Sequence, residues 1–236
     1  KLKSVIESND PSMIFVQERG PFEPALAAID HSRAMLVTGD DLAGWMETVA
    51  GPEVESRLAQ VTPDTVAKIL LTSGSTGQPK GVITTQRMLC SNQAMIAYSW
   101  PFLEDKPPVL VDWLPWNHTF GGSFCFNLIL YHGGTLYIDE GRPAPGRMEA
   151  SLRNLADAKP TIYLNVPRGF DLLVPALEAD PDLRDAIFEN LEMLFFAAAA
   201  LPQNLRDRIE ALSIAALGVR LPFTSSLGST ETAPAA

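Results

Sequence analysis

Cysteine is scarce in this 236-residue chain, which contains only Cys90 and Cys125. Neither belongs to a CxxC motif or to a cluster of cysteine and histidine, so the sequence predicts no disulfide framework and no zinc site. Isolated cysteines usually behave as small apolar side chains inside a protein. We therefore expect both thiols to be buried.

Positive charge is also in short supply, because 18 Lys and Arg residues stand against 28 Asp and Glu residues, for a formal net charge of −10. A nucleic-acid-binding surface depends on Lys and Arg contacts to phosphate groups. This balance argues against a nucleic acid as a partner. A polyphosphate ligand would instead need local cations, loop N–H groups and a metal ion.

Long hydrophobic runs are missing too. The longest candidate, residues 193–201, falls far short of the roughly 20 residues that cross a membrane as a helix. The opening Lys1-Leu2-Lys3-Ser4-Val5-Ile6-Glu7 is charged and amphipathic, unlike a signal peptide. The sequence thus predicts no membrane span and a cytoplasmic location, and it leaves a homodimer open.

Strand-like and helix-like segments alternate along most of the chain, which favours an α/β fold with strands buried between helices. Residues 67–85 have the pattern of a strand, a polar loop and a second strand, whereas residues 52–65 suggest a linker or a surface excursion. We divide the chain into residues 1–66 and a core of residues 67–236. Strands are further predicted at 13–17, 35–38, 109–114, 135–138, 161–164 and 194–197, and helices at 24–29, 87–98, 121–131, 147–158, 170–178 and 203–217.

The loop between the two strands of residues 67–85 is the most informative run. It reads Thr72-Ser73-Gly74-Ser75-Thr76-Gly77-Gln78-Pro79-Lys80-Gly81. Glycines let a ligand approach the main chain, and successive N–H groups, hydroxyls and a lysine suit a phosphate. The run predicts a polyphosphate-binding loop, with a polar surface hairpin as the alternative.

The order of residues separates this loop from the P-loop of nucleotide triphosphatases. That motif places its lysine at the start of a helix, whereas Lys80 stands between Pro79 and Gly81 and is followed by β-favouring residues. The run closely resembles the signature loop of the adenylate-forming superfamily. That superfamily contains acyl-CoA synthetases, aryl-CoA ligases, luciferases and peptide-synthetase adenylation domains.

A second element of the same superfamily occurs in Leu227-Gly228-Ser229-Thr230-Glu231. Alone it is a common capping turn. The resemblance implies that Thr230 bonds the α-phosphate and that Glu231 helps to hold Mg²⁺, an ion that takes hard oxygen ligands. The family often has an aromatic residue beside adenine at the position of Leu227, so apolar packing is retained here and ring stacking is lost.

A third element follows the predicted strand at 109–114. His118 matches the family pattern P-x-x-H-x-x-G, whose histidine lies near the acyl carboxylate, although a lone histidine is more often structural. Its neighbours Trp116 and Phe120 are candidates for an apolar acyl pocket or for the core.

A fourth element is the small-residue run Ala198-Ala199-Ala200, after the predicted strand at 194–197. In the family, a strand at this place ends in small residues that lie against adenine and the acyl group. Alanine keeps the small size of glycine but gives up its freedom at positive φ.

The resemblance covers about residues 67–236 and implies an acid–thiol ligase. A carboxylate attacks Mg·ATP to give acyl-AMP and pyrophosphate, and coenzyme A then displaces AMP. The resemblance implies an aromatic or fatty acid as the substrate. Residues 195–203 with Thr232-Ala233-Pro234 look most like feruloyl-CoA-synthetase-type ligases. An acyl-AMP ligase or a peptide-synthetase adenylation domain is the alternative within the superfamily, and a non-catalytic nucleotide-binding module is the alternative outside it.

Members of the superfamily continue, beyond the G-x-T-E element, with a ribose-binding aspartate, a hinge and a small C-terminal domain that supplies a catalytic lysine. This chain ends at Ala236. The resemblance therefore implies a part of the large N-terminal domain. We expect this part alone to be inactive or impaired, because the missing domain rotates in the second half-reaction.

Overall fold

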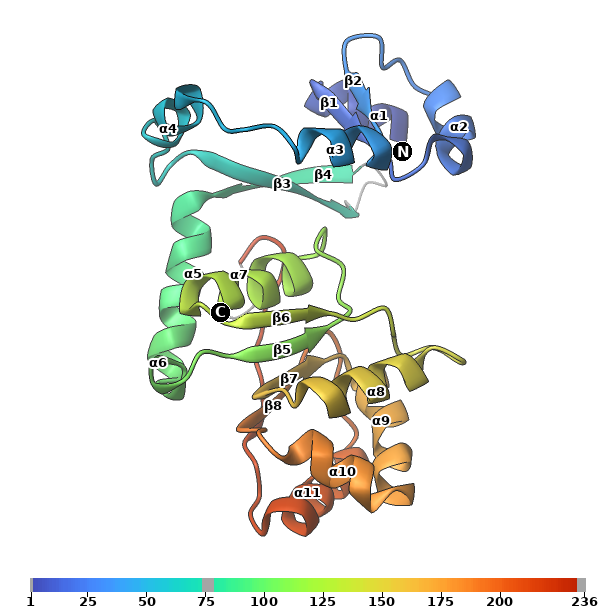
Figure 1. Cartoon of the computed structure of the whole chain (residues 1–236), viewed down its shortest axis with the longest axis vertical. Helices are drawn as coiled ribbons and strands as arrows, with labels where there is room; N and C mark the ends of the chain where they lie inside the picture. The colour runs from blue at the N-terminus through green and yellow to red at the C-terminus, as the bar shows by residue number, and fades with distance from the viewer. Residues whose placement is uncertain (1, 74–78, 233–236) are drawn as a thin grey trace. The chain divides into compact units, whose positions relative to one another are not determined.

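The computed structural model describes residues 2–73 and 79–232. The predicted loop residues Gly74 to Gly77 lie outside this part of the chain. Two compact units are formed, Lys1–Ile83 and Thr84–Ala236, and each is described by itself (Figure 1). The predicted division after residue 66 concerned parts of a larger domain and stays a prediction.

The first unit contains short elements on a largely exposed chain. Strands β1 and β2 pair in parallel, with Met13 opposite Met35, and β3 pairs with β4 around the candidate loop. None of the residues in α1, α3 and α4 is buried. The elements are α1 (Leu2–Asn9), β1 (Met13–Phe15), α2 (Arg19–Ala27), β2 (Met35–Val37), α3 (Gly39–Trp45), α4 (Pro52–Leu58), β3 (Val66–Ser73) and β4 (Pro79–Thr85).

The second unit alternates strands and helices, as an α/β fold requires. Its elements are α5 (Gln86–Ser99), α6 (Phe102–Asp105), β5 (Val109–Asp112), a π-helix (Thr119–Cys125), α7 (Phe126–His132), β6 (Thr135–Ile138), α8 (Met148–Ala158), β7 (Ile162–Asn165), α9 (Pro167–Ala179), α10 (Pro181–Phe188), β8 (Met193–Phe196), α11 (Gln203–Leu217) and β9 (Phe223–Ser225). All pairings of these strands are parallel: β5 with β6, β7 with β8, and β8 with β9. The predicted α/β class is confirmed.

The strands of the second unit separate two hydrophobic cores. Every residue of β7 and β8 is buried, as the near-continuous apolar runs of parallel strands predict. Because side chains alternate between the faces of a strand, Met193 and Phe195 enter one core and Leu194 and Phe196 the other. The first core is completed by α5, α6, the π-helix and α7, and the second by α8, α9, α10 and α11.

Two expectations need correction. Cys90 is exposed on α5, and Cys125 is buried. The prediction that both thiols are buried is therefore right for Cys125 and wrong for Cys90. The helix predicted over 121–131 is continuous but begins as a π-helix at Thr119. It ends as predicted at Gly133, whose φ of 66° closes α7 in the left-handed conformation.

Candidate functional site

The candidate phosphate loop is flanked by β3 and β4 of the first unit. Lys80 lies on β4 with an exposed side chain, and Thr72 is half-buried near the end of β3. Gly81 faces Ile69 so closely that a Cβ atom there would lie 2.9 Å from the Ile69 Cγ2 atom. The glycine after Lys80 thus allows the two strands to pair tightly at the base of the loop.

His118 is placed by the turn that follows β5. It is the residue before the π-helix, and its Nδ1 atom accepts a hydrogen bond from the Phe120 backbone N–H at 3.1 Å. Its carbonyl accepts from the Gly122 N–H at 2.8 Å. Because Nδ1 accepts, the neutral ring carries its proton on Nε2, so the exposed imidazole has an N–H to offer to an anion.

Both glycines after His118 are required by close packing of the backbone. A Cβ atom at Gly122 would lie 1.9 Å from the Trp116 carbonyl oxygen, and one at Gly121 would lie 2.7 Å from that of Leu114. The turn over residues 114–118 therefore folds directly onto the π-helix. The P-x-x-H-x-x-G pattern has this geometric basis in the chain.

The two aromatic neighbours of His118 take different places. Phe120 is buried and its ring centroid lies 5.9 Å from that of Phe124 and 6.0 Å from that of Phe195, so it belongs to the core. Trp116 is 47% exposed and packs on Phe126 with the ring centroids 4.8 Å apart. Of the two, Trp116 alone is accessible at the surface of the second unit.

The small-residue run after β8 has a strained backbone. Ala198 has φ of 75°, in the left-handed region that L side chains rarely adopt. The side chains of Ala198, Ala199 and Ala200 are exposed. This segment therefore presents main chain and methyl groups at the surface, in a conformation typical of glycine.

Thr230 and Glu231 lie in a turn closed by their neighbours. The Ser229 N–H donates to the Thr232 hydroxyl at 3.1 Å, and the Thr232 N–H donates to the Ser229 hydroxyl at 3.2 Å. Thr230 is half-buried and Glu231 is exposed. Leu227 is 82% exposed, which leaves its side chain free to cover an apolar ligand.

The donors of this turn fit magnesium, which prefers hard oxygen ligands and keeps much of its shell for water and phosphate. Glu231 offers a carboxylate and Thr230 a hydroxyl. Within residues 2–73 and 79–232, no group of three or more His, Cys, Asp or Glu side chains is arranged to hold a metal ion.

Three of the predicted segments leave the same edge of the parallel strands. In the register of β8 and β9, Phe196 pairs with Ser225, so the segments 197–200 and 226–231 start side by side. Strand β5 adjoins β7, since the Thr161 N–H donates to the Val109 carbonyl at 3.0 Å, and the turn to His118 follows the end of β5. The carboxyl edge of parallel strands is where α/β proteins commonly bind ligands.

A cavity of about 530 Å³ in the second unit was not foreseen from the sequence. Its walls come from α5, from Phe195 on β8 and from the end of β9, and they are mainly apolar. No motif marks it, because its walls are ordinary helix and strand residues brought together by the fold. The lining residues are Ala94, Met95, Ile96, Tyr98, Ser99, Trp100, Phe195, Thr224, Ser225 and Ser226.

Comparison with known proteins agrees with the geometry. The family model described as "AMP-binding enzyme" matches residues 1–236. The chain belongs to the AMP-binding enzyme family, which confirms the resemblance drawn from the motifs.

Several relatives are ligases of carboxylic acids. Over 81 residues, 34% of this chain and 12% of the relative, the chain is 41% identical to the medium-chain fatty acid–acyl-carrier-protein ligase TtuA of Teredinibacter turnerae. It is 31% identical to the peroxisomal long chain acyl-CoA synthetase 6 of Arabidopsis thaliana over 130 residues, 53% of this chain and 17% of that one. A malonyl-CoA ligase, solved as a ternary product complex with methylmalonyl-CoA and AMP, aligns with a TM-score of 0.73 and 27% identity.

These alignments differ in how much they cover. The malonyl-CoA ligase matches 98% of this chain, and the chain covers 44% of that ligase. Relative to the two curated relatives, the chain spans less than a fifth of either length. In the part of the chain that the structure describes, no helix is long and apolar enough to cross a membrane.

Proposed function

We propose that the protein to which this chain belongs is an ATP-dependent carboxylate–CoA ligase. It joins an acid to AMP with release of pyrophosphate, and it then transfers the acyl group from AMP to the thiol of coenzyme A. The observation that carries the proposal is the turn with Thr230 and Glu231 leaving the same strand edge as Ala198–Ala200. Family membership over the whole chain supports it.

Each predicted residue has a part in this proposal. The loop residues Thr72, Ser73, Gly74, Ser75, Thr76 and Gly77, together with Lys80, bind the phosphates of ATP. Ala198, Ala199 and Ala200 on one side and Leu227, Gly228 and Ser229 on the other lie against the nucleoside. Thr230 bonds the α-phosphate and Glu231 is a ligand of Mg²⁺, whose charge would offset that of the phosphates.

The imidazole of His118 supports the approach of one anion to another. With Nδ1 occupied by the Phe120 N–H, the neutral ring offers its Nε2–H to the acid. A hydrogen bond there would orient the carboxylate and reduce its repulsion from the phosphates. No residue of the chain has to act as a nucleophile, because ATP supplies the activation and the protein supplies position and charge.

For the acid we propose an apolar or aromatic substrate. The cavity beside Ser226 supports this class, since its walls include Met95, Trp100 and Phe195. Apolar walls with few polar groups are typical of sites that take apolar ligands. The narrower likeness to feruloyl-CoA-synthetase-type ligases stays a prediction, as do a cytoplasmic location, a homodimer and the lack of a nucleic-acid partner.

The test is ATP–pyrophosphate exchange by the whole protein with a panel of fatty acids, hydroxycinnamates and short dicarboxylates. Exchange should require an acid with an apolar body, and the acyl-AMP formed should be converted to a thioester by coenzyme A. Lys80→Met and Thr230→Val should each lower exchange by about 100-fold, because each removes a contact to the phosphates. Lys3→Met, which removes another exposed lysine charge of the first unit, should leave the rate unchanged.

Two results would overturn the proposal. Absence of exchange with every acid would favour a non-catalytic nucleotide-binding module. Exchange followed by transfer to a carrier protein but not to coenzyme A would indicate the acyl-carrier or peptide-synthetase alternative.

A further inference from the structure

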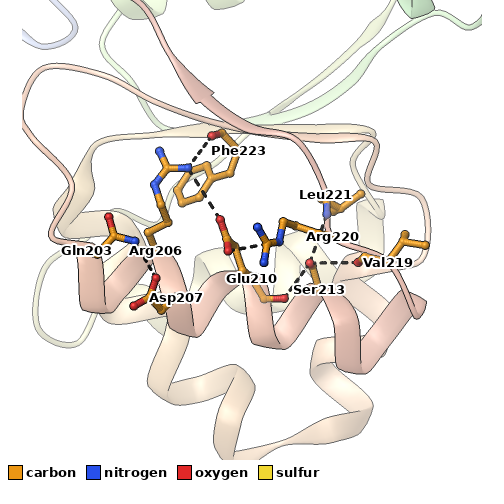
Figure 2. Close-up of polar contacts among 9 residues, drawn as sticks. All are labelled: Gln203, Arg206, Asp207, Glu210, Ser213, Val219, Arg220, Leu221 and Phe223. Atoms are coloured by element: carbon orange, nitrogen blue, oxygen red, sulfur yellow. Dashed lines mark hydrogen bonds and ion pairs between the residues drawn. The ribbon is translucent and has the colours of Figure 1, made fainter.

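Arg206 of α11 packs against the two paired strands that carry the candidate nucleotide-binding segments. Its Nη1 atom, presented from α11, donates to the Phe223 carbonyl at 3.0 Å (Figure 2). The guanidinium carbon lies 5.6 Å from the centroid of the Phe196 ring and 5.1 Å from that of the Phe223 ring. One cation therefore contacts the last residue of β8 and the first residue of β9.

These contacts lie next to the two segments that are proposed to bind the nucleotide. Phe196 is followed directly by the small-residue segment 197–200, and β9, which Phe223 begins, leads directly into the segment 226–231. The two rings also pack on each other, edge to face, with centroids 5.2 Å apart. A shift of β9 along β8, with α11 in place, would break the bond to the Phe223 carbonyl and move the Phe223 ring away from the guanidinium.

A second set of contacts fixes Arg206 itself. Glu210, one turn further along α11, lies 4.0 Å from the Arg206 Nη1 atom through its Oε1 atom. Its Oε2 atom lies 3.3 Å from the Nε atom of Arg220. The same helix bonds the chain just before β9, because the Ser213 hydroxyl donates to the Val219 carbonyl and accepts from the Leu221 N–H (Figure 2).

We propose that Arg206 is a positioning residue for nucleotide binding. It sets the place of segment 226–231 relative to segment 197–200 by bonding the backbone of β9 and stacking on Phe196 and Phe223. The proposal rests on the proposed function, in which both segments contact the nucleotide. Arginine suits this task better than lysine, because its planar group stacks on aromatic rings while its N–H groups still donate.

The test compares Arg206→Met and Arg206→Lys with Arg220→Met in the whole protein. Arg220 binds the same Glu210, but its side chain is 66% exposed. The measurement is pyrophosphate exchange as a function of ATP concentration, together with unfolding in urea. Loss of folded protein lowers kcat and leaves KM for ATP unchanged, whereas displaced segments raise KM.

We expect Arg206→Met to raise KM for ATP by about tenfold or more, because small displacements of binding groups are costly. Arg206→Lys keeps the charge and should raise KM by less, and Arg220→Met should stay within about twofold of the wild type. If Arg206→Met does not fold, KM for ATP is compared between Arg206→Lys and Arg220→Met.

The proposal is overturned if KM for ATP in the folded Arg206 variants equals that of the wild type. It is overturned as well if Arg220→Met raises KM equally, since the effect would then belong to the Glu210 ion pairs. Wild-type protein without exchange would instead refute the proposed function, so the two failures are distinct.

Discussion

Ala198 adopts a backbone conformation that costs an L-amino acid about 1–2 kcal/mol. Its φ of 75° falls in the small-residue segment that follows β8. Strain of this kind persists where the surrounding structure fixes the chain, and it is often found at functional sites. The end of β8 is such a place, with Phe196 held by Arg206 and by Phe223.

Replacing Ala198 by glycine should therefore stabilise the protein. Glycine removes the cost of positive φ but adds freedom to the unfolded chain, so we expect a net gain of roughly 0.5–1 kcal/mol. Urea unfolding measures the change. Ala199→Gly is the matched control, since Ala199 has no positive φ, and it should be neutral or destabilising. Equal gains from both variants would contradict the strain argument.

Asp112 is a buried carboxyl at the end of β5. Its Oδ1 atom accepts a hydrogen bond from the Leu114 N–H at 2.9 Å. Burial, opposed by the Leu114 N–H and by the Cys125 thiol and reinforced by Asp139, raises the pKa of Asp112 to about 6. The folded protein thus holds a proton that the unfolded chain, with a pKa near 3.8, releases more easily.

The sign of the pH dependence follows from this difference. Between pH 4 and 6 the folded state binds more protons at Asp112 than the unfolded state, so the free energy of unfolding decreases as the pH rises through this window. The contribution amounts to about 3 kcal/mol at most. Asp112→Asn should remove this decrease, so the difference in unfolding free energy between the variant and the wild type should change with pH across this window, as measured by urea unfolding at several pH values. The exposed Asp157→Asn should follow the wild-type profile, and an Asp112→Asn profile parallel to that of the wild type would refute the assignment.

At the scale of elements, the π-helix after His118 depends on glycine. The 1.9 Å between a Cβ atom at Gly122 and the Trp116 carbonyl leaves no room for any side chain. The turn over residues 114–118 and the π-helix therefore form a single packed element, and His118 is held both by this backbone packing and by the bond from the Phe120 N–H to its Nδ1 atom.

Gly122→Ala should separate these two parts and destabilise the fold by about 2–3 kcal/mol. Gly44→Ala is the control, because Gly44 lies in α3 with open space around it and alanine favours helices. Thermal unfolding followed by circular dichroism distinguishes them. A neutral Gly122→Ala would show that the turn can move away from the π-helix.

How far the sequence predicts an element depends on whether the element buries an apolar face. Helix α11 was predicted with its observed bounds because its apolar residues recur at helical spacing and Gly218 ends it. Helix α4 was missed, since none of its residues is buried and it therefore lacks an apolar pattern. The π-helix was missed because a wider helical turn leaves no distinct signal in residue type.

Across the whole molecule, the residues predicted from the motifs fall in both units. Lys80 belongs to the first unit, whereas His118, Ala198 and Thr230 belong to the second. Motif order alone predicted these residues, because each motif is a short run of the chain. The cavity and the contacts of Arg206 escaped prediction, since they join α5 or α11 to strands distant in sequence and depend on the tertiary fold.

The two cysteines differ in exposure, so labelling of their thiols can report whether the second unit is folded. Cys90 is exposed on α5, while Cys125 is buried and burial raises the pKa of its thiol, which suppresses the reactive thiolate. Of these two thiols, a maleimide dye should label only Cys90 in the folded state, on the helix that follows β4. Cys125 should react only when the second unit opens, so its labelling reports unfolding of that unit.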